Sequence, residues 1–510
     1  MARLSSADLI ERVFDPATFV SWDEPVERTG LDPDSPYAHE LAEAARRSGV
    51  DESIVTGEAL LGGRRVAVVN GEFAFLAGSI GMAAAERLVR AIERATSEGL
   101  PLLASPSSGG TRMQEGTVAF LQMVKISAAV AAHKAVGLPY LVYLRHPTTG
   151  GVLASWGSLG HVTAAAPGAL IGFLGPRVYE ALYGERFPEG VQVAENLYRN
   201  GVIDAVLEPE QLREMARRAL NVIMPRPQDT PTDDGFDLPE VPEQAEAHAV
   251  LKDGPDLDAW HCIELSRRPD RPGVRDLLRY AAHEVLPLNG TMAGEQDPGM
   301  LLTLARFGTS SCVLLGQCRQ GQTVAEPIGP AALREARRGM RLAAELRLPL
   351  VTVIDTPGAA LSQGAEEGGL AGEIARCLHD LSVLHAPVLS VLLGQGCGGA
   401  ALALLPADHT IAAQHAWLSP LPPEGASAIV YRDTSHAAEM ARRQGVRALD
   451  LNRNGVVDYV VAELPDAADE PEAFCRRLGR TIHRQVDELA AQPVSKLLAA
   501  RFSRYRHLGG

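Results

Sequence analysis

The feature that most constrains this 510-residue chain is an internal duplication that covers most of its length. Pro101 and Pro139 are 38 positions apart (139 − 101), as are Pro349 and Pro387 (387 − 349). In each half a glycine pair begins 11 positions after the second proline. Landmarks that coincide without a gap are hard to produce by chance, so the repeat predicts one fold used twice.

Within each half, short runs rich in valine, isoleucine and leucine alternate with helical patterns. Residues 64–79 (RRVAVVNGEFAFLAGS) precede a helical stretch at 82–99, and residues 348–355 (LPLVTVID) precede another at 373–385. Alternation of this kind predicts a mostly parallel sheet in a layered α/β domain.

The two halves are separated by residues 226–258, which are acidic, rich in proline and poor in apolar side chains. This composition predicts a partly disordered linker; the alternative is an extended arm packed against a neighbouring surface. We therefore expect one domain over residues 1–225 and a second over residues 259–510.

Charge and cysteine content narrow the classes of partner and compartment. A formal net charge of −15 at pH 7 argues against a nucleic-acid or anionic-membrane partner. The six cysteines form no CxxC pair, which argues against zinc or a disulfide framework and favours a reducing cytoplasm. The N-terminus lacks the apolar core of a signal peptide. Residues 152–176 carry no formal charge, but their broken apolar runs favour buried strands and a small helix over a membrane span.

The glycine pairs Gly150-Gly151 and Gly398-Gly399 each follow a strand-like run and precede small residues. No nucleotide-binding, serine-hydrolase or zinc-protease motif accompanies them. Main-chain N–H groups at the start of a helix can stabilise negative charge on a carbonyl oxygen, as in an oxyanion hole. The same glycines would also permit close packing of a helix on a strand, and the residue pattern leaves both interpretations open.

Several stretches resemble a known enzyme family. The first half is similar to the β subunit of bacterial acetyl-CoA carboxylase carboxyltransferase at SGGTRMQEG (108–116), TTGGVLASWGSLG (148–160), PGALIGFLGPRV (167–178) and GVIDAV (201–206). The second half resembles its α subunit at RRPDRPGVRDLL (267–278), VIDTPGA (353–359), GAEE (364–367), GQGCGGAALAL (394–404) and PPEGASAIV (422–430). The order is that of a fused, actinobacterial-type chain. The resemblance implies a duplicated crotonase-like (ClpP/crotonase) fold, a ββα superhelix with two homologous domains.

The resemblance also implies an activity, in which a carboxyl group moves from carboxybiotin to the α-carbon of acetyl-CoA or another acyl-CoA. No Met-Lys-Met attachment sequence occurs, so biotin is expected on a separate biotinylated carrier protein, and no bound metal is expected. In this family the cofactor itself takes the α-proton, and two oxyanion holes hold the enolate and the biotin ureido oxygen. The active sites of the family form in a homo-oligomer, a dimer or a hexamer, between the N-terminal half of one protomer and the C-terminal half of another.

Carried over by the resemblance, Gly150 and Gly151 serve the acyl-CoA carbonyl, and Gly399 and Ala400 serve the biotin carbonyl. The acyl-CoA pocket is expected to include Ser108, Gly109, Gly110, Arg112 and Lys125, and the biotin side Gly358, Ala359 and Gly398. Arg112 and Lys125 are assigned to CoA phosphates, with surface ion pairs as the alternative. On the helix predicted at 331–345, Arg334, Arg338 and Arg341 share one face, which either attracts an anionic partner or is simply solvated.

Several departures from the family lie in the second half. Ala360-Leu361 stands where the α subunit usually has Tyr-Pro, Gly368 stands where it has Arg, and residues 419–425 (SPLPPEG) are altered. The zinc ribbon of many β subunits is missing. Two other functions therefore stay open: a decarboxylase or transcarboxylase acting on malonyl- or methylmalonyl-CoA, and a weakly active scaffold subunit of a carboxylase complex.

Overall fold

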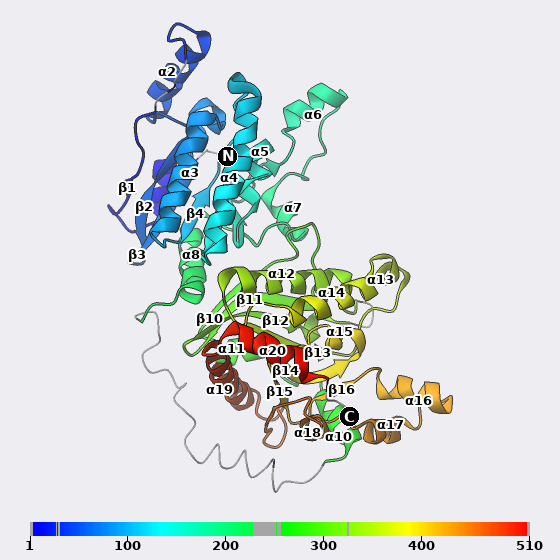
Figure 1. Cartoon of the computed structure of the whole chain (residues 1–510). Helices are drawn as coiled ribbons and strands as arrows, with labels where there is room; N and C mark the ends of the chain where they lie inside the picture. Colours follow the sequence, from blue (N-terminus) through cyan, green and yellow to red (C-terminus); the bar gives the residue numbers. More distant parts are fainter. Residues whose placement is uncertain are drawn as a thin grey trace. The chain divides into compact units, whose positions relative to one another are not determined.

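The computed structural model describes residues 4–26, 28, 31–227, 251, 257–323 and 326–506 (Figure 1). It separates the chain into two compact units, one of residues 1–220 with 292–294 and one of residues 221–291 with 295–510. Most of the predicted linker, residues 228–250 and 252–256, lies outside the described residues. The domain boundaries at 225 and 259 stay a prediction.

The first unit is built on a seven-stranded sheet with the order β1-β2-β3-β4-β5-β7-β9. The pairs β1–β2 and β2–β3 are antiparallel, and the remaining pairs are parallel. Parallel strands are covered on both faces, which explains why every residue of β5 is buried. The strands are β1 (Val20–Ser21), β2 (Ile54–Leu61), β3 (Arg64–Gly71), β4 (Leu102–Ser105), β5 (Tyr140–Leu144), β7 (Val162–Ala165) and β9 (Ala205–Val206), with β6 (Thr148–Thr149) and β8 (Ile171–Gly172) forming a separate pair.

Helices cover this sheet, and α3 (Met82–Ser97) packs against β2 and β3 with α4 (Gly116–Ala135) beside it (Figure 1). The two-residue hairpin between β2 and β3 uses Gly62 and Gly63, both with positive φ, as a tight hairpin requires. The other helices are α1 (Ser6–Val13), α2 (Pro36–Ser48), η1 (Leu76–Gly78), η2 (Met113–Glu115), α5 (Gly150–Leu153), η3 (Trp156–Ser158), α6 (Pro176–Tyr183), α7 (Ala194–Arg199) and α8 (Pro209–Ile223).

The second unit repeats this plan on an eight-stranded sheet with the order β10-β11-β12-β13-β14-β15-β17, and β16 pairs with β14. Only the pairs β10–β11 and β11–β12 among the described strands of this sheet are antiparallel. The strands are β10 (Glu284–Leu288), β11 (Met300–Phe307), β12 (Ser310–Gln317), β13 (Leu350–Thr356), β14 (Val388–Cys397), β15 (His409–Ala413), β16 (Trp417–Ser419) and β17 (Tyr459–Val461).

The helices of the second unit include α12 (Pro330–Leu346), which packs on β11 and β12 as α3 does on β2 and β3. The others are α10 (Ala259–Ser266), α11 (Val274–Ala281), η5 (Arg319–Gly321), α13 (Gln363–Glu367), α14 (Leu370–Ser382), α15 (Gly398–Leu402), α16 (Pro423–Tyr431), α17 (Ala437–Gln444), α18 (Ala448–Arg453), α19 (Pro471–Ala490) and α20 (Val494–Arg504).

The predicted duplication is visible in backbone detail at positions 248 residues apart. Gly81 and Gly329 are the N-caps of α3 and α12, with φ of −101° and −108°. Parallel bridges join Ile80 to Thr111 and, at the same offset, Ile328 to Ala359. The two units are therefore two copies of one antiparallel-strand-pair-then-helix arrangement, as the ββα repeat requires.

Hydropathy gives one further finding about the described helices. The stretch Met113–Ala135 is long and apolar enough to cross a membrane, and a third of its most apolar window is buried. One such helix is weak evidence for a membrane span, because helices of soluble proteins can have the same length and hydropathy. The uncharged residues 152–176 contain the buried strand β7 and the short strand β8.

Candidate functional site

The first glycine turn lies between β6 and the short helix α5. Gly150 begins α5 with φ of +64°, and its N–H donates to the carbonyl oxygen of Phe173 at 2.9 Å. The N–H of Gly151 follows in the first helical turn, where no intrahelical acceptor exists, and it meets no acceptor in the described part of the chain. Gly151 is half-buried, so this unused donor lies at a partly open surface.

The loop of Ser108, Gly109 and Gly110 lies directly against this turn. A Cβ atom built on Gly150 would stand 3.3 Å from the Cα of Gly110. The Ser108 hydroxyl accepts a hydrogen bond from the Gly110 N–H at 3.0 Å, and the Ser108 carbonyl accepts one from the Thr149 N–H at 2.9 Å. The five predicted residues of this group, 108–110 and 150–151, are thus brought together.

The second glycine turn, 248 residues later, repeats the left-handed glycine and the adjoining hydrogen-bonded loop. Gly398 begins α15 with φ of +66°, and Gly358 has φ of +138°. The Thr356 hydroxyl accepts from the Gly358 N–H at 3.1 Å, as Ser108 does for Gly110. A Cβ atom on Gly358 would lie 3.8 Å from the Sγ of Cys397, so the loop with Gly358 and Ala359 adjoins this turn.

Gly399 and Ala400 differ in what they can offer a ligand. Their N–H groups meet no acceptor in the described chain, but Gly399 is half-buried and Ala400 is fully buried. The single chain therefore presents Gly399, and not the predicted second donor Ala400, to a ligand. Burial raises the pKa of the neighbouring Cys397 thiol to about 11, so this side chain adds no charge to the turn at neutral pH.

Arg112, which the sequence assigns to CoA phosphates, is fully buried. Its guanidinium pairs with both carboxylate oxygens of Glu52 and donates to the carbonyl oxygen of Ser79 at 2.7 Å. Burial alone would raise the pKa of Glu52, but hydrogen bonds and charge from Arg112 outweigh it and lower that pKa. The Arg112 charge is thus neutralised inside the unit, and it does not face a solvent-borne phosphate.

Lys125 is exposed and forms an ion pair with Glu86 between α4 and α3. Two of the three arginines on the predicted face of α12 are also engaged. Arg334 pairs with Glu295 at 2.6 Å, and buried Arg338 donates to the carbonyl oxygen of Gly290 at 2.9 Å. Arg334 and Arg338 are thus engaged within the unit, whereas Arg341, the third residue of the predicted face, is exposed.

The departures from the family pattern have distinct structural settings. Leu361 is 94% exposed beside the second turn. Gly368 ends α13, where a Cβ atom would lie 2.9 Å from the carbonyl oxygen of Gly364, and its own carbonyl accepts from Arg334 at 2.6 Å. The site of the missing arginine is therefore closed to a side chain and is reached instead by Arg334.

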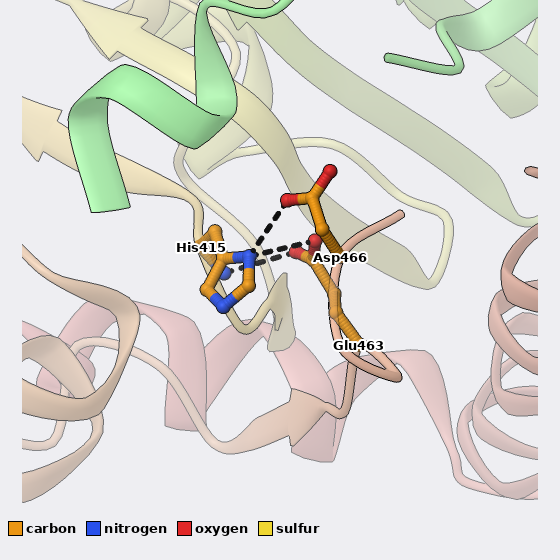
Figure 2. A group of neighbouring side chains, drawn as sticks. All are labelled: His415, Glu463 and Asp466. Carbon is orange, nitrogen blue, oxygen red and sulfur yellow. Dashed lines mark hydrogen bonds and ion pairs between the residues drawn. The ribbon is translucent and has the colours of Figure 1, made fainter. Parts of the chain in front are cut away.

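A buried cluster of His415, Glu463 and Asp466 lies in the second unit (Figure 2). The Nδ1 atom of His415 is 2.9 Å from Glu463 and 3.0 Å from Asp466. Burial alone would lower the pKa of His415, but hydrogen bonds to Asp466 and Glu463 outweigh it and raise this pKa to about 9. His415 is therefore a cation at neutral pH.

Three such side chains have metal-ligand chemistry, but their surroundings oppose a metal ion. Arg271 donates to both carboxylate oxygens of Glu463 at 2.7 Å and lies 3.4 Å from Asp466. Two cations thus balance two carboxylates, and a divalent ion would face a guanidinium. We interpret the cluster as a buried ion-pair network.

Sequence reasoning missed the polar side chains beneath the second turn. Gln317 is fully buried and donates to the carbonyl oxygen of Ala400 at 2.8 Å. Asp355 lies within the family-like stretch VIDTPGA (353–359), which placed it near the second turn but did not indicate its role. Nothing in the sequence near Gln317 singles it out.

The sequence matches the family model described as the carboxyl transferase domain over residues 26–497. A relative from Mycobacterium tuberculosis strain H37Rv, named probable biotin-dependent acyl-coenzyme A carboxylase beta3 subunit, is 58% identical over 510 residues, which cover 100% of this chain and 99% of the relative. A relative from Salinispora arenicola, named acetyl-coenzyme A carboxylase carboxyl transferase subunits beta/alpha, is 35% identical over 519 residues, with 100% and 91% covered.

Solved structures agree in fold. Transcarboxylase 12S, described as a hexamer assembly with methylmalonyl-coenzyme A and methylmalonic acid bound, has a TM-score of 0.72 at 20% identity and covers 96% of this chain and 90% of its own. A single-chain, multi-domain long-chain acyl-CoA carboxylase has a TM-score of 0.70 at 18% identity and covers 94% of this chain and 46% of its own. These likenesses confirm the predicted duplicated crotonase-like fold.

Proposed function

The chain belongs to the carboxyl transferase domain family, and from this premise we propose that it is the carboxyltransferase component of a biotin-dependent acyl-CoA carboxylase. It would move a carboxyl group from carboxybiotin, held on a separate carrier subunit, to the α-carbon of an acyl-CoA. One observation carries the proposal: both units have a half-buried glycine turn with an unused main-chain N–H at the start of a helix. A cytoplasmic location is part of the proposal, and the six buried cysteines, all free thiols, are compatible with it.

On the acyl-CoA side, we assign the thioester oxygen to the N–H of Gly151. The Gly150 N–H already donates to Phe173, which leaves Gly151 as the donor that a ligand can use. A preorganised main-chain donor of this kind stabilises the developing enolate by about 3 kcal/mol. No carboxylate is required there, because a negative side chain would oppose the enolate. Lys125 stays our candidate for a CoA phosphate, whereas buried Arg112 does not.

On the carrier side, the second turn fits a carbonyl group. Gly398 has a left-handed backbone conformation, and the Gly399 N–H has no acceptor in the described chain. A Cβ atom on Gly399 would lie 2.6 Å from the Ile374 side chain, so any other residue there would displace that side chain. Carboxybiotin on the carrier would supply the carboxyl group when bound, and we propose that Gly399 donates to its ureido oxygen. Gly358 and Ala359 line this turn.

Exposed apolar side chains support self-association. One group of them lies on η2 and α4 of the first unit, and others lie beside the second turn and on α16 of the second unit. These groups are Met113, Val118, Phe120, Leu121, Val124, Leu361, Ile429 and Val430. Neighbouring exposed apolar side chains, such as those on α4, are typical of interaction surfaces. We propose a homo-oligomer in which the first unit of one protomer faces the second unit of another. Such a contact would also exclude water from both turns.

One assay tests the function: purified protein, a chemically carboxylated biotin carrier, and a panel of acyl-CoAs of increasing chain length. Carboxylation of any acyl-CoA supports the proposal and gives the substrate preference. Release of CO2 from malonyl-CoA without a carrier would favour a decarboxylase instead. Inactivity with every carrier, by a protein that still binds the carrier subunit, would favour a scaffold.

A further inference from the structure

The second glycine turn is preceded by an irregularity in the sheet. Between Ile354 and Thr356 the register of β13 against β14 shifts, because Ile354 pairs with Leu392 and Thr356 pairs with Gly396. Strand β14 thus advances by four residues while β13 advances by two. Such bulges leave main-chain groups without ladder partners and redirect the strand, here just before Gly398.

Asp355 occupies this irregularity and is buried. Its Oδ1 atom accepts from the N–H of Gln395 at 3.0 Å, which provides a partner inside the bulge. Arg319 donates to both carboxylate oxygens, from Nε at 2.9 Å and from Nη2 at 3.1 Å. A Cβ atom on Gly394 would lie 2.6 Å from Asp355 Oδ1, so only glycine leaves room for this ion pair under β14.

Gln317 links Asp355 to the turn itself. Its Oε1 atom accepts from the Asp355 N–H at 3.1 Å, and its Nε2 donates to the Ala400 carbonyl at 2.8 Å. At the end of α15 the N–H groups of Ala403 and Leu404 donate to the carbonyl oxygens of Gly399 and Ala401. No main-chain N–H of the described chain donates to the carbonyl oxygen of Ala400. The Gln317 amide therefore satisfies a buried carbonyl that the short helix leaves free.

The first unit holds its turn differently. The position 248 residues before Gln317 is Val69, which is part of the apolar core, and the position before Asp355 is Ser107. There the Ser155 hydroxyl donates to the Gly151 carbonyl at 2.6 Å. The amide and carboxylate beneath the turn are therefore specific to the second unit.

We propose that Gln317 and Asp355 are positioning residues for the second glycine turn, which fix the direction of the Gly399 N–H. This inference rests on the proposed function, in which Gly399 serves the carrier-borne group. The buried Gln317 amide is hydrogen-bonded to α15, and the Asp355–Arg319 ion pair supports strand β14, which leads into the turn. Rigid support of this kind is what an oxyanion donor needs in order to act without reorganisation.

The test compares Gln317→Met with Gln485→Met. Both remove a buried amide of the second unit without changing side-chain length, and Gln485 on α19 has no hydrogen bond to either turn among the described contacts. In Gln317→Met we expect amide hydrogen exchange in residues 395–402 to accelerate about tenfold or more, because a buried hydrogen-bond partner is lost. We also expect kcat to fall about tenfold or more with the KM for acyl-CoA unchanged, because acyl-CoA is served by the other unit. Gln485→Met should change neither.

Two further variants keep the test decisive. Gln317→Leu also removes the donor to Ala400, with no titratable group in the buried site, and it replaces Gln317→Met if that variant does not fold. Asp355→Asn keeps an acceptor for Gln395 and weakens the pair with Arg319, so a smaller loss of kcat is expected. Wild-type exchange in residues 395–402 and wild-type kcat in these variants would overturn the inference. A wild-type enzyme without transfer activity would instead refute the proposed function. Hydrogen exchange in residues 395–402 would still test whether Gln317 and Asp355 hold the second glycine turn.

Discussion

Gly150 and Gly398 have the same left-handed backbone conformation, with φ of +64° and +66°, at the first residue of a short helix in each unit. This conformation is costly for a residue with a Cβ atom. It directs the next N–H group out of the strand and into the first helical turn, where it has no internal acceptor. The two glycines thus produce an unused donor twice in one chain.

Alanine at either position should therefore cost stability and activity together. We expect Gly150→Ala and Gly398→Ala each to lower the free energy of unfolding by about 1–2 kcal/mol, because a left-handed alanine is strained. Gly49, the left-handed C-cap of α2, is a matched control, because a Cβ atom there would meet nothing within 4 Å. Urea denaturation should show a similar loss for Gly49→Ala, whose carboxyl transfer should stay at the wild-type rate.

Gly151→Val should abolish transfer and leave the fold largely intact. A Cβ atom there would lie 3.2 Å from Thr111 and 3.3 Å from Met123, so the added side chain crowds the donor without a strained φ. Gly175→Val is the control, since its Cβ atom would meet nothing within 4 Å. Steady-state rates measure the loss of transfer, and circular dichroism checks that the fold is kept. An active Gly151→Val enzyme would contradict the assignment of the Gly151 N–H as the donor.

The Arg112–Glu52 pair should govern stability more than substrate affinity. Arg112→Met removes the buried cation that pairs with both oxygens of Glu52 and leaves this carboxylate with Arg28, at 2.9 Å. Complete loss of a buried partner costs about 3–5 kcal/mol in comparable cases, so we expect a loss toward the lower end of that range. The double variant Arg112→Met/Glu52→Gln should recover part of that loss. Denaturation midpoints test this, and a variant of normal stability with a raised KM for acyl-CoA would restore the phosphate assignment.

Stability should fall with rising pH because of His415. Its folded pKa of about 9 lies above the unfolded value near 6.5, so its contribution is complete below pH 6.5 and is lost as the pH rises to about 9. That loss amounts to about 3 kcal/mol in the free energy of unfolding. His415→Gln should flatten this dependence. His133, whose pKa burial lowers to about 4, is the control, and His133→Gln should leave the slope between pH 6.5 and 9 unchanged.

Charge on the apolar face of α4 should weaken self-association. Val124 is 68% exposed on that face, and Val124→Glu places a carboxylate in the proposed contact. Sedimentation should show smaller species for Val124→Glu and loss of transfer activity at low protein concentration. Glu93→Gln removes a charge from α3, outside the proposed contact, and should leave sedimentation and transfer activity unchanged. If Val124→Glu sediments like the wild type, the contact lies elsewhere.

Much of this molecule could be predicted from its sequence. The spacing of prolines and glycines indicated the duplication, and the glycine pairs at 150 and 398 marked both turns. Those features are readable because glycine is strongly favoured where the backbone is left-handed or closely approached, so its position is a good indicator of local conformation.

The fate of the charged and polar side chains was decided only by the tertiary structure. Arg112 meets Glu52 across 60 positions of sequence, and Gln317 meets Ala400 across 83. Whether a cation faces a ligand or a buried carboxylate depends on which distant segments pack around it, because burial makes an unpaired charge costly and selects a partner. The sequence alone determined where the backbone turns, and packing determined which side chains hold those turns in place.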